Sequence, residues 1–476
     1  MASVGMNTDI TALVDAAVAG NIEQVTGIAR DLIAHGSGAA ELIGRIGIIA
    51  SRGDSDGHPV ITLAAAAMMS RWSLSLQYLL GEDPQDHRRE LPLLVQAVAA
   101  AVPAVRAGNA TSITYPEPLF PSGLPEGQTV GTMMTKAIFD NDATLVERLL
   151  LGLHGTGADY RTIHIRTYDG ISTTFQNSGH PLMFAVRGFQ LLDSVEWGKS
   201  VPPIIHWLAP HIPVHAEEPA WVRTIRDFLS DQHHSFAAYR TRLAAPKEAS
   251  ALPLRRLVLS DADAPQICQA VFDAVMKNGA SAHGVASVIA LAATDLLQRV
   301  GDDNREVFVT MAHSLLYTAA THVVYSQVQE IESLPLLLTS ACYLNAFNKE
   351  QAQQQQGAAQ PPSRAQVLGG GLIAPALLET LGQQLDAQDL AGAFSTARRY
   401  IQLGHDSRAM FAVIARAAAR SDAAADAGHT LQIVQAAGEE YMNWPTQLRD
   451  TNIEGFLHVA LRAAALAPRN SLTDNL

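Results

Sequence analysis

Apolar residues recur at the period of an α-helix along almost the whole chain. Segments such as IEQVTGIARDLIA, ATLVERLLLGL and LAGAFSTARRYIQL carry apolar side chains at positions i, i+3, i+4 and i+7. Alanine and leucine dominate these segments and favour helix locally as well. Alternating runs typical of strands are scarce, and Arg161–Thr173 (RTIHIRTYDGIST) is the one stretch that we expect to be a hairpin or an extended loop. The pattern predicts an all-α protein.

Three segments have the composition of loops. Pro116–Gln128 is rich in proline and glycine, and Pro202–Pro219 is rich in proline and contains three histidines. Residues 350–363 (EQAQQQQGAAQPPS) are of low complexity, and we expect a linker between helices there.

A layout of paired histidines recurs along the chain. In each of four stretches, one histidine lies near the end of a helix, and a second opens or lies within a later helix. The first histidines are His35, His154, His283 and His405; the second are His58, His180, His313 and His429. We expect one helical domain over residues 1–476 that is built from about four divergent repeats around a central site. The approximate repeats are residues 8–110, 130–230, 252–345 and 366–470.

The two sets of histidines have different explanations. A histidine at a helix C-terminus can bond the last carbonyls, which explains the first set, although His283 fits it least well. In the second set, His58 and His180 each precede a proline, the residue favoured in the first turn of a helix. His313 and His429 lie in equivalent apolar contexts, and a buried imidazole needs a hydrogen-bond partner or a metal.

If the four repeats surround a common axis, the four second histidines converge. Nitrogen ligands suit iron, copper, zinc or nickel rather than magnesium or calcium. The alternative is that each of the four is an independently satisfied structural histidine.

Composition narrows the classes of function. The chain has 476 residues, 33 Lys and Arg against 46 Asp and Glu, and a net charge of −13. With 48% apolar residues the chain is not disordered. Five lysines and a negative charge argue against binding to nucleic acid phosphates. The two cysteines, Cys268 and Cys342, are too few for a disulfide framework or a thiolate zinc site.

Targeting signals and common cofactor motifs are absent from the sequence. The N-terminal residues lack the basic and apolar regions of a secretory signal. No apolar run approaches the roughly 18–20 residues that cross a bilayer, and Pro59–Met69 is the longest candidate. We therefore expect a cytoplasmic protein without a membrane partner, and a homodimer is compatible with the composition. No GxGxxG follows a strand and no GxSxG occurs, so we expect neither flavin nor nicotinamide, nor an α/β-hydrolase.

Three stretches around the second histidines resemble a known family. GHPLMFAVRGFQL, VTMAHSLLYTAATH and ADAGHTLQIVQAA are similar to histidine-bearing helices of the questin oxidase-like family. That family contains non-haem iron enzymes that oxidatively cleave anthraquinone rings in polyketide pathways. The layout is similar along most of the chain, and the motif matches cover only these short stretches. The resemblance implies an all-helical fold and one Fe(II) held by four histidines and a carboxylated lysine. The implied ligands are His58, His180, His313 and His429.

The chain departs from the family pattern at one ligand. The family's lysine is expected about one helical turn after the last histidine, where this chain has Gln432. Gln432 shares a helix face with His429 and cannot be carboxylated, but its amide oxygen can coordinate a metal or orient a water. Tyr317 follows His313 by four residues and faces the same way. It is a candidate catalytic residue that would hydrogen-bond a substrate or oxygen, although a core aromatic needs no such role.

The sequence therefore predicts an oxidoreductase, a mononuclear non-haem iron monooxygenase or dioxygenase. Its partners would be dioxygen and a small aromatic or quinone substrate, whose ring it would cleave in a Baeyer–Villiger-like or dioxygenase reaction. One alternative is zinc in the same site, with hydrolase or lyase chemistry. The other is an α-solenoid that binds partner proteins, in which His58 and His429 would lie far apart.

Overall fold

The computed structural model describes residues 9–82, 87–232, 241, 249–327, 334–354, 373–474 and 476. Within these ranges the chain is helical, without a strand, and one isolated bridge joins Ser421 and Arg469. The prediction of an all-α protein is confirmed. The number of repeats stays a prediction.

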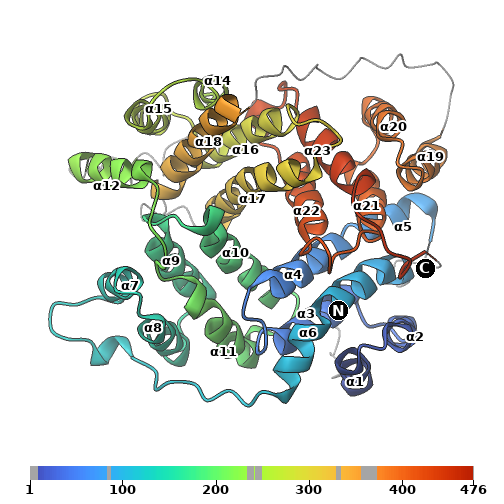
Figure 1. The fold of residues 1–476 in the computed structure, drawn as a ribbon, viewed down its shortest axis with the longest axis horizontal. Helices are drawn as coiled ribbons and strands as arrows, with labels where there is room; N and C mark the ends of the chain where they lie inside the picture. The colour runs from blue at the N-terminus through green and yellow to red at the C-terminus, as the bar shows by residue number, and fades with distance from the viewer. Residues whose placement is uncertain are drawn as a thin grey trace.

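Four central helices form a closed ring (Figure 1). They are α4 (His58–Ser70), α10 (His180–Leu192), α17 (Arg305–Gln327) and α22 (His429–Met442). Each packs against the next along the chain, and α22 packs against α4. These helices are almost continuously apolar because they are covered on all sides; α10, for example, is buried from Pro181 to Leu192.

Two further helices pack against each central helix. These are α3 (Ala39–Ala50) and α6 (Leu91–Ala110) on α4, α9 (Tyr160–Ser172) and α11 (Trp197–Leu208) on α10, α16 (Ala282–Leu297) and α18 (Leu334–Gln354) on α17, and α21 (Ser407–Ala418) and α23 (Glu454–Ala465) on α22.

Helix pairs lie at the periphery of the ring (Figure 1). The pairs are α1 (Thr11–Ala19) with α2 (Ile22–Ala34), α7 (Val130–Phe139) with α8 (Ala143–Gly155), α14 (Pro253–Val258) with α15 (Ala264–Met276), and α19 (Ala374–Asp386) with α20 (Leu390–Gln402). The remaining helical elements are α5 (Ser73–Leu80), α12 (Ala220–Gln232), η1 (His87–Glu90), η2 (Pro121–Gly123), η3 (Asn177–Gly179), η4 (Ala209–His211) and η7 (Thr446–Leu448).

The expected hairpin at residues 161–173 is wrong. This stretch is α9, which begins after Asp159, whose side chain accepts a hydrogen bond from the backbone N–H of Thr162. Its buried side chains include Ile163, Thr167 and Ile171, each four residues apart. Packing of this helical face outweighs the preference of β-branched residues for strands.

The three expected loops have different outcomes. Residues 116–128 contain no α-helix, and the loop prediction is confirmed there. Residues 202–208 are wrong as a loop, because they belong to α11. Pro202 and Pro203 lie inside that helix, in its second turn, and lack the N–H groups that would bond to carbonyls four residues earlier. Of the linker at 350–363, residues 350–354 end α18, and the rest lies outside the described residues.

Two helices are longer and more apolar than the sequence led us to expect. By length and composition, α6 and α17 are each sufficient to cross a membrane. In both, the most apolar window is largely buried inside the protein, 67% and 72% respectively, and the core helix of a soluble protein passes the same test.

Candidate metal centre

Four histidines, one from each central helix, form a closed circuit. Neighbouring ring centroids are 5.2 Å apart for His58 and His180, 5.1 Å for His180 and His313, 5.1 Å for His313 and His429, and 5.5 Å for His429 and His58. The structure therefore brings together all four histidines of the predicted site. An open solenoid would keep His58 and His429 apart, and these central helices close into a ring instead.

A glycine in the left-handed conformation starts three of the four helices. Gly57, Gly179 and Gly428 have φ angles of 88°, 86° and 70°, and in each case the next residue is the histidine that begins the helix. Only glycine adopts this conformation without a steric cost. Each of these Gly-His pairs is therefore a turn that places an imidazole at the first residue of a helix. His313 differs, because it lies inside α17.

The same glycines allow neighbouring central helices to approach each other closely. A Cβ atom on Gly57 would lie 2.4 Å from the ring of Phe184, and one on Gly179 would lie 2.2 Å from the ring of Tyr317. A Cβ on Gly428 would lie 1.9 Å from the hydroxyl of Thr62. Each contacted residue comes one helical turn after the histidine of the next central helix. The helix starts can therefore interlock only if these positions have no side chain.

Backbone carbonyls orient three of the four imidazoles. Nδ1 of His429 is 2.5 Å from the carbonyl oxygen of Asp426, and Nδ1 of His313 is 3.0 Å from that of Val309. Nδ1 of His180 contacts the carbonyl oxygen of Asn177. Because a carbonyl only accepts, each Nδ1 carries the proton, and the lone pair of a neutral ring is on Nε2. Ligating histidines commonly donate their other N–H to a carbonyl in this way.

His58 is the exception. Its Nδ1 is buried without a hydrogen-bond partner among the described residues, and its backbone N–H donates to Asp56 Oδ1 at 2.8 Å. An unpartnered buried nitrogen costs free energy unless an unseen group satisfies it.

Burial favours the neutral form of three of these histidines. It lowers the pKa of His180 to about 4 and that of His313 to about 3, and neighbouring imidazoles add to both shifts. Burial, followed by the charge of His429, also lowers the pKa of His58. Neutral imidazoles are the form that binds a metal at neutral pH.

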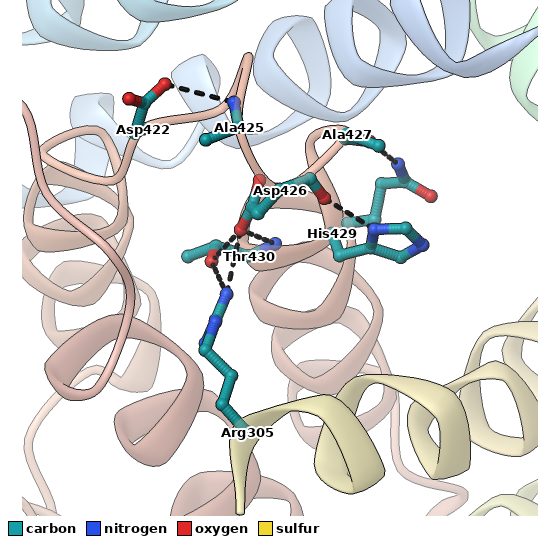
Figure 2. Close-up of polar contacts among 8 residues, drawn as sticks. Arg305, Asp422, Ala425, Asp426, Ala427, His429 and Thr430 are labelled. Atoms are coloured by element: carbon teal, nitrogen blue, oxygen red, sulfur yellow. Dashed lines mark hydrogen bonds and ion pairs between the residues drawn. The ribbon is translucent and has the colours of Figure 1, made fainter.

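Asp426 stabilises the turn before His429, as Figure 2 shows. Its Oδ2 accepts hydrogen bonds from the backbone N–H of Thr430 at 3.1 Å and the Thr430 hydroxyl at 2.5 Å. It also pairs with Arg305, at the start of α17, at 2.8 Å. Because the Asp426 carbonyl accepts from His429, this network connects the orientation of the imidazole to the neighbouring central helix.

Asp54 has a comparable place before His58. Its carboxylate accepts from the backbone N–H groups of Gly57 at 2.9 Å and Val60 at 3.1 Å, and from Trp207 Nε1 at 3.2 Å. Burial raises its pKa to about 6. Both aspartates thus stabilise the turn from which a histidine helix begins.

A shared metal requires the four rings to move closer together. Among the described residues, no three His, Cys, Asp or Glu side chains are already placed so that they could hold a metal ion. Neighbouring centroids are 5.1–5.5 Å apart and metal–nitrogen bonds are about 2.1 Å long, so the rings would have to close in on a central ion. The imidazole donors, three of which have Nδ1 held by a carbonyl, fit a transition metal after such a closure.

Gln432 and Tyr317 lie within one turn of the ring. Gln432 is buried, and its side-chain N–H donates to the carbonyl of Ala427 at 3.2 Å, so its amide oxygen is turned away from that carbonyl. Tyr317 is 1% exposed and packs against Phe175 at 5.4 Å and Tyr343 at 5.8 Å. Burial raises its pKa, so it is a neutral phenol. Its ring supports Gly179, the residue before His180.

A fifth histidine near the ring was missed in the sequence. His211, at the end of η4, packs against Phe184 with centroids 4.8 Å apart, and burial lowers its pKa to about 4. Its Nε2 is buried and finds no partner in the described part of the chain. The three histidines of residues 202–219 are the available signal, but the prolines around them predict a loop.

Comparisons with known proteins supply no relative for this chain. It matches no protein-family model, no curated protein and no solved structure. The function is therefore argued from the geometry of the site and from the short stretches that carry the resemblance.

Proposed function

We propose that His58, His180, His313 and His429 bind one divalent transition metal, in the first place Fe(II). The observation that supports this is the closed circuit of imidazoles with neighbouring centroids 5.1–5.5 Å apart. Four separate stretches of chain contribute to it. A shared metal would give these imidazoles the partner that a buried ring nitrogen needs.

We further propose that the protein is an oxygenase that acts on an aromatic or quinone ring. Bound Fe(II) would supply the electrons that activate dioxygen. All four imidazoles are partly exposed, so a substrate reaches them from outside the ring. The ring-cleavage reaction rests on the resemblance to the questin oxidase-like family, whereas the metal site rests on the geometry.

The surrounding residues have supporting roles in this proposal. The carbonyls of Asn177, Val309 and Asp426 hold the protons of three imidazoles and so keep Nε2 free as a donor. Gln432 offers a neutral amide oxygen in place of a carboxylated lysine. Tyr317 positions His180 through Gly179, so we assign it a packing role.

The decisive experiment measures metal content on the full chain, purified without an affinity histidine tag and reconstituted anaerobically with Fe(II). The variants are His180→Ala and His429→Ala, and the matched control is His35→Ala, which removes an exposed histidine at the end of α2. We expect about one iron per chain in the wild type and the control, and a loss in both site variants. Oxygen consumption is then measured with a panel of anthraquinones.

Other outcomes separate the alternatives. Iron that both site variants retain, or no metal after reconstitution, would contradict the proposal. Zinc that fills the site in preference to iron would favour a hydrolase or lyase. Absence of any metal would direct attention to partner proteins.

A further inference from the structure

A second group of titratable side chains lies further along the central helices. Arg187 on α10, His322 on α17, and Glu439 and Glu440 on α22 surround a cavity of about 450 Å³, together with His283 on α16. At a rise of about 1.5 Å per residue, His322 is roughly 13 Å along α17 from His313, and Glu440 is roughly 16 Å along α22 from His429. This His283–His322 pocket is therefore separate from the four-histidine ring, and the proposed oxygenase has no use for it.

Glu440 fixes the orientation of His322. Its Oε1 accepts a hydrogen bond from Nδ1 of His322 at 2.6 Å, and the two residues are 2% and 5% exposed. Burial raises the pKa of Glu440. Burial opposes protonation of His322, but the carboxylates of Glu440 and Glu439 outweigh it and raise its pKa. With Nδ1 held by a carboxylate, Nε2 of His322 is directed to the opposite side.

The Nε2 atoms of His322 and His283 face each other in direct contact, with ring centroids 4.0 Å apart. Burial lowers the pKa of His283 to about 4, so this ring is neutral. Two facing nitrogen lone pairs repel, so a hydrogen atom or a metal ion has to lie between them. A proton shared by the two rings is one such occupant, and a metal ion bound to both is the other.

The pocket also contains a carboxylate oxygen that could meet a bound ion. Oε2 of Glu440 is buried and has no hydrogen-bond partner among the described residues. Glu439 is the next residue, and its charge acts on His322. Burial raises the pKa of Glu439, and Arg187 opposes that rise. A divalent ion with its water molecules would satisfy this buried oxygen of Glu440.

We propose that the His283–His322 pocket binds a divalent transition metal of the zinc type, with Nε2 of His283 and Nε2 of His322 as ligands. Glu440 is the carboxylate that orients a ligating histidine, an arrangement common in zinc sites. Glu439, which also lines the cavity, supplies a further oxygen donor. Fewer than three protein donors are in place in the described residues. The site is therefore open, with positions left for water or a substrate, and binds more weakly than a closed site.

The test is a titration of the metal-free full chain with Zn²⁺, followed by isothermal calorimetry, and with Co²⁺, followed by its visible spectrum. His283→Gln removes one ligand at a partly exposed position, and His154→Gln is the matched control on α8. We expect His283→Gln to lose one metal equivalent and the control to keep it. We expect Glu440→Gln, which keeps an acceptor for His322, to weaken the same equivalent by about 10–100-fold.

The two metal proposals fail in different ways. If His283→Gln loses one equivalent of bound metal and His429→Ala keeps it, the result supports metal binding in the His283–His322 pocket. This holds whether or not the four-histidine ring binds iron. If His283→Gln and Glu440→Gln bind Zn²⁺ and Co²⁺ as the wild type does, the pair shares only a proton and the proposal is overturned. Each variant is first checked by its circular dichroism spectrum and urea midpoint, so that a failure to fold is not read as a loss of metal.

Discussion

The imidazole of His58 lies 5.5 Å from that of His429, although these residues belong to the first and last quarters of the chain. The contact exists because α22 packs against α4 and because Gly428 leaves room for Thr62. The candidate metal centre is therefore complete only when both ends of the chain have folded together. Metal binding to such a site contributes free energy to the folding of the whole ring.

Gly179→Ala should destabilise the protein and disrupt the metal centre. The new Cβ would overlap the ring of Tyr317 and would also be strained by the φ angle of 86°. The strain costs about 1–2 kcal/mol, and overpacking adds about 1–3 kcal/mol. The free energy of unfolding, measured with urea, and the iron content should both fall.

Gly157→Ala is the matched control for this change. Its φ angle is 72°, and no atom lies within 4 Å of the position of its Cβ. We expect only the conformational cost of about 1–2 kcal/mol, with full iron content. Equal losses of stability in the two variants would show that the contact of Gly179 with Tyr317 does not determine how the central helices pack.

The four candidate ligands could be predicted from the sequence, whereas the contacts that position them could not. His58, His180, His313 and His429 can be found in the sequence because each opens or lies within an apolar helical pattern that recurs along the chain. The contacts of Gly57 with Phe184 and of Gly179 with Tyr317 join distant stretches, so no local pattern shows them.

Two predictions from the sequence, the hairpin at residues 161–173 and the loop that contains His211, are wrong for a similar physical reason. Residues 161–173 are rich in β-branched residues, yet form α9 because one helical face is buried against the core. His211 falls in a proline-rich stretch, and only the packing of η4 brings it to Phe184. Tertiary packing decided both cases, and it depends on residues far away in the sequence.

Arg305→Gln should weaken metal binding without contacting the metal. The change removes the ion pair with Asp426, a side chain that is only 7% exposed and whose backbone carbonyl holds His429. Loss of a charged partner from a buried group costs about 1–3 kcal/mol, and loss of orientation lowers metal affinity about 10–100-fold. Urea unfolding and competition with a metal chelator measure the two effects.

Arg398→Gln is the control for Arg305→Gln. It breaks a pair with Glu454 in which both side chains are about one-third exposed, far along the chain from the ring residues of α17. An exposed pair contributes about 0–1 kcal/mol, and metal affinity should be unchanged. If Arg305→Gln behaves like this control, the network of Asp426 has no role in the site.

Stability should fall in acid because His164 is buried in the neutral state. His164 is 3% exposed, contacts Phe189 with centroids 4.3 Å apart, and has a pKa lowered by burial to about 4. The unfolded histidine has a pKa of about 6.5, so below that pH the unfolded chain binds a proton that the folded chain does not. The contribution of the neutral His164 side chain to the free energy of unfolding is thus complete above pH 6.5 and is lost as the pH falls toward 4.

His164→Phe isolates this effect, since phenylalanine fits an aromatic cluster and does not titrate. Relative to the wild type, the variant should gain about 2 kcal/mol between pH 7 and pH 5. The other histidines titrate in both proteins and cancel in the difference. Urea unfolding of both proteins at several pH values, with a chelator present, measures this difference in the free energy of unfolding. If the difference does not change with pH, His164 takes up a proton in the folded chain as readily as in the unfolded chain.

Tyr317→Phe and Tyr317→Ala should separate packing from chemistry. The phenylalanine variant keeps the ring beneath Gly179, so we expect full iron content and a kcat/KM within about 3-fold of the wild type, a difference of less than 1 kcal/mol. The alanine variant leaves a cavity among Phe175, Tyr343 and Gly179, which costs about 3–5 kcal/mol and frees His180 to move.

These variants are compared by urea unfolding, iron content and turnover of the same quinone substrate. A loss of kcat in Tyr317→Phe, with iron content and KM unchanged, would show that the hydroxyl takes part in the reaction and would make Tyr317 a catalytic residue. If both variants retain iron, the contact between Gly179 and Tyr317 does not position His180. The packing assignment holds only if iron is kept by phenylalanine and lost by alanine, because the two side chains differ chiefly in the ring that supports Gly179.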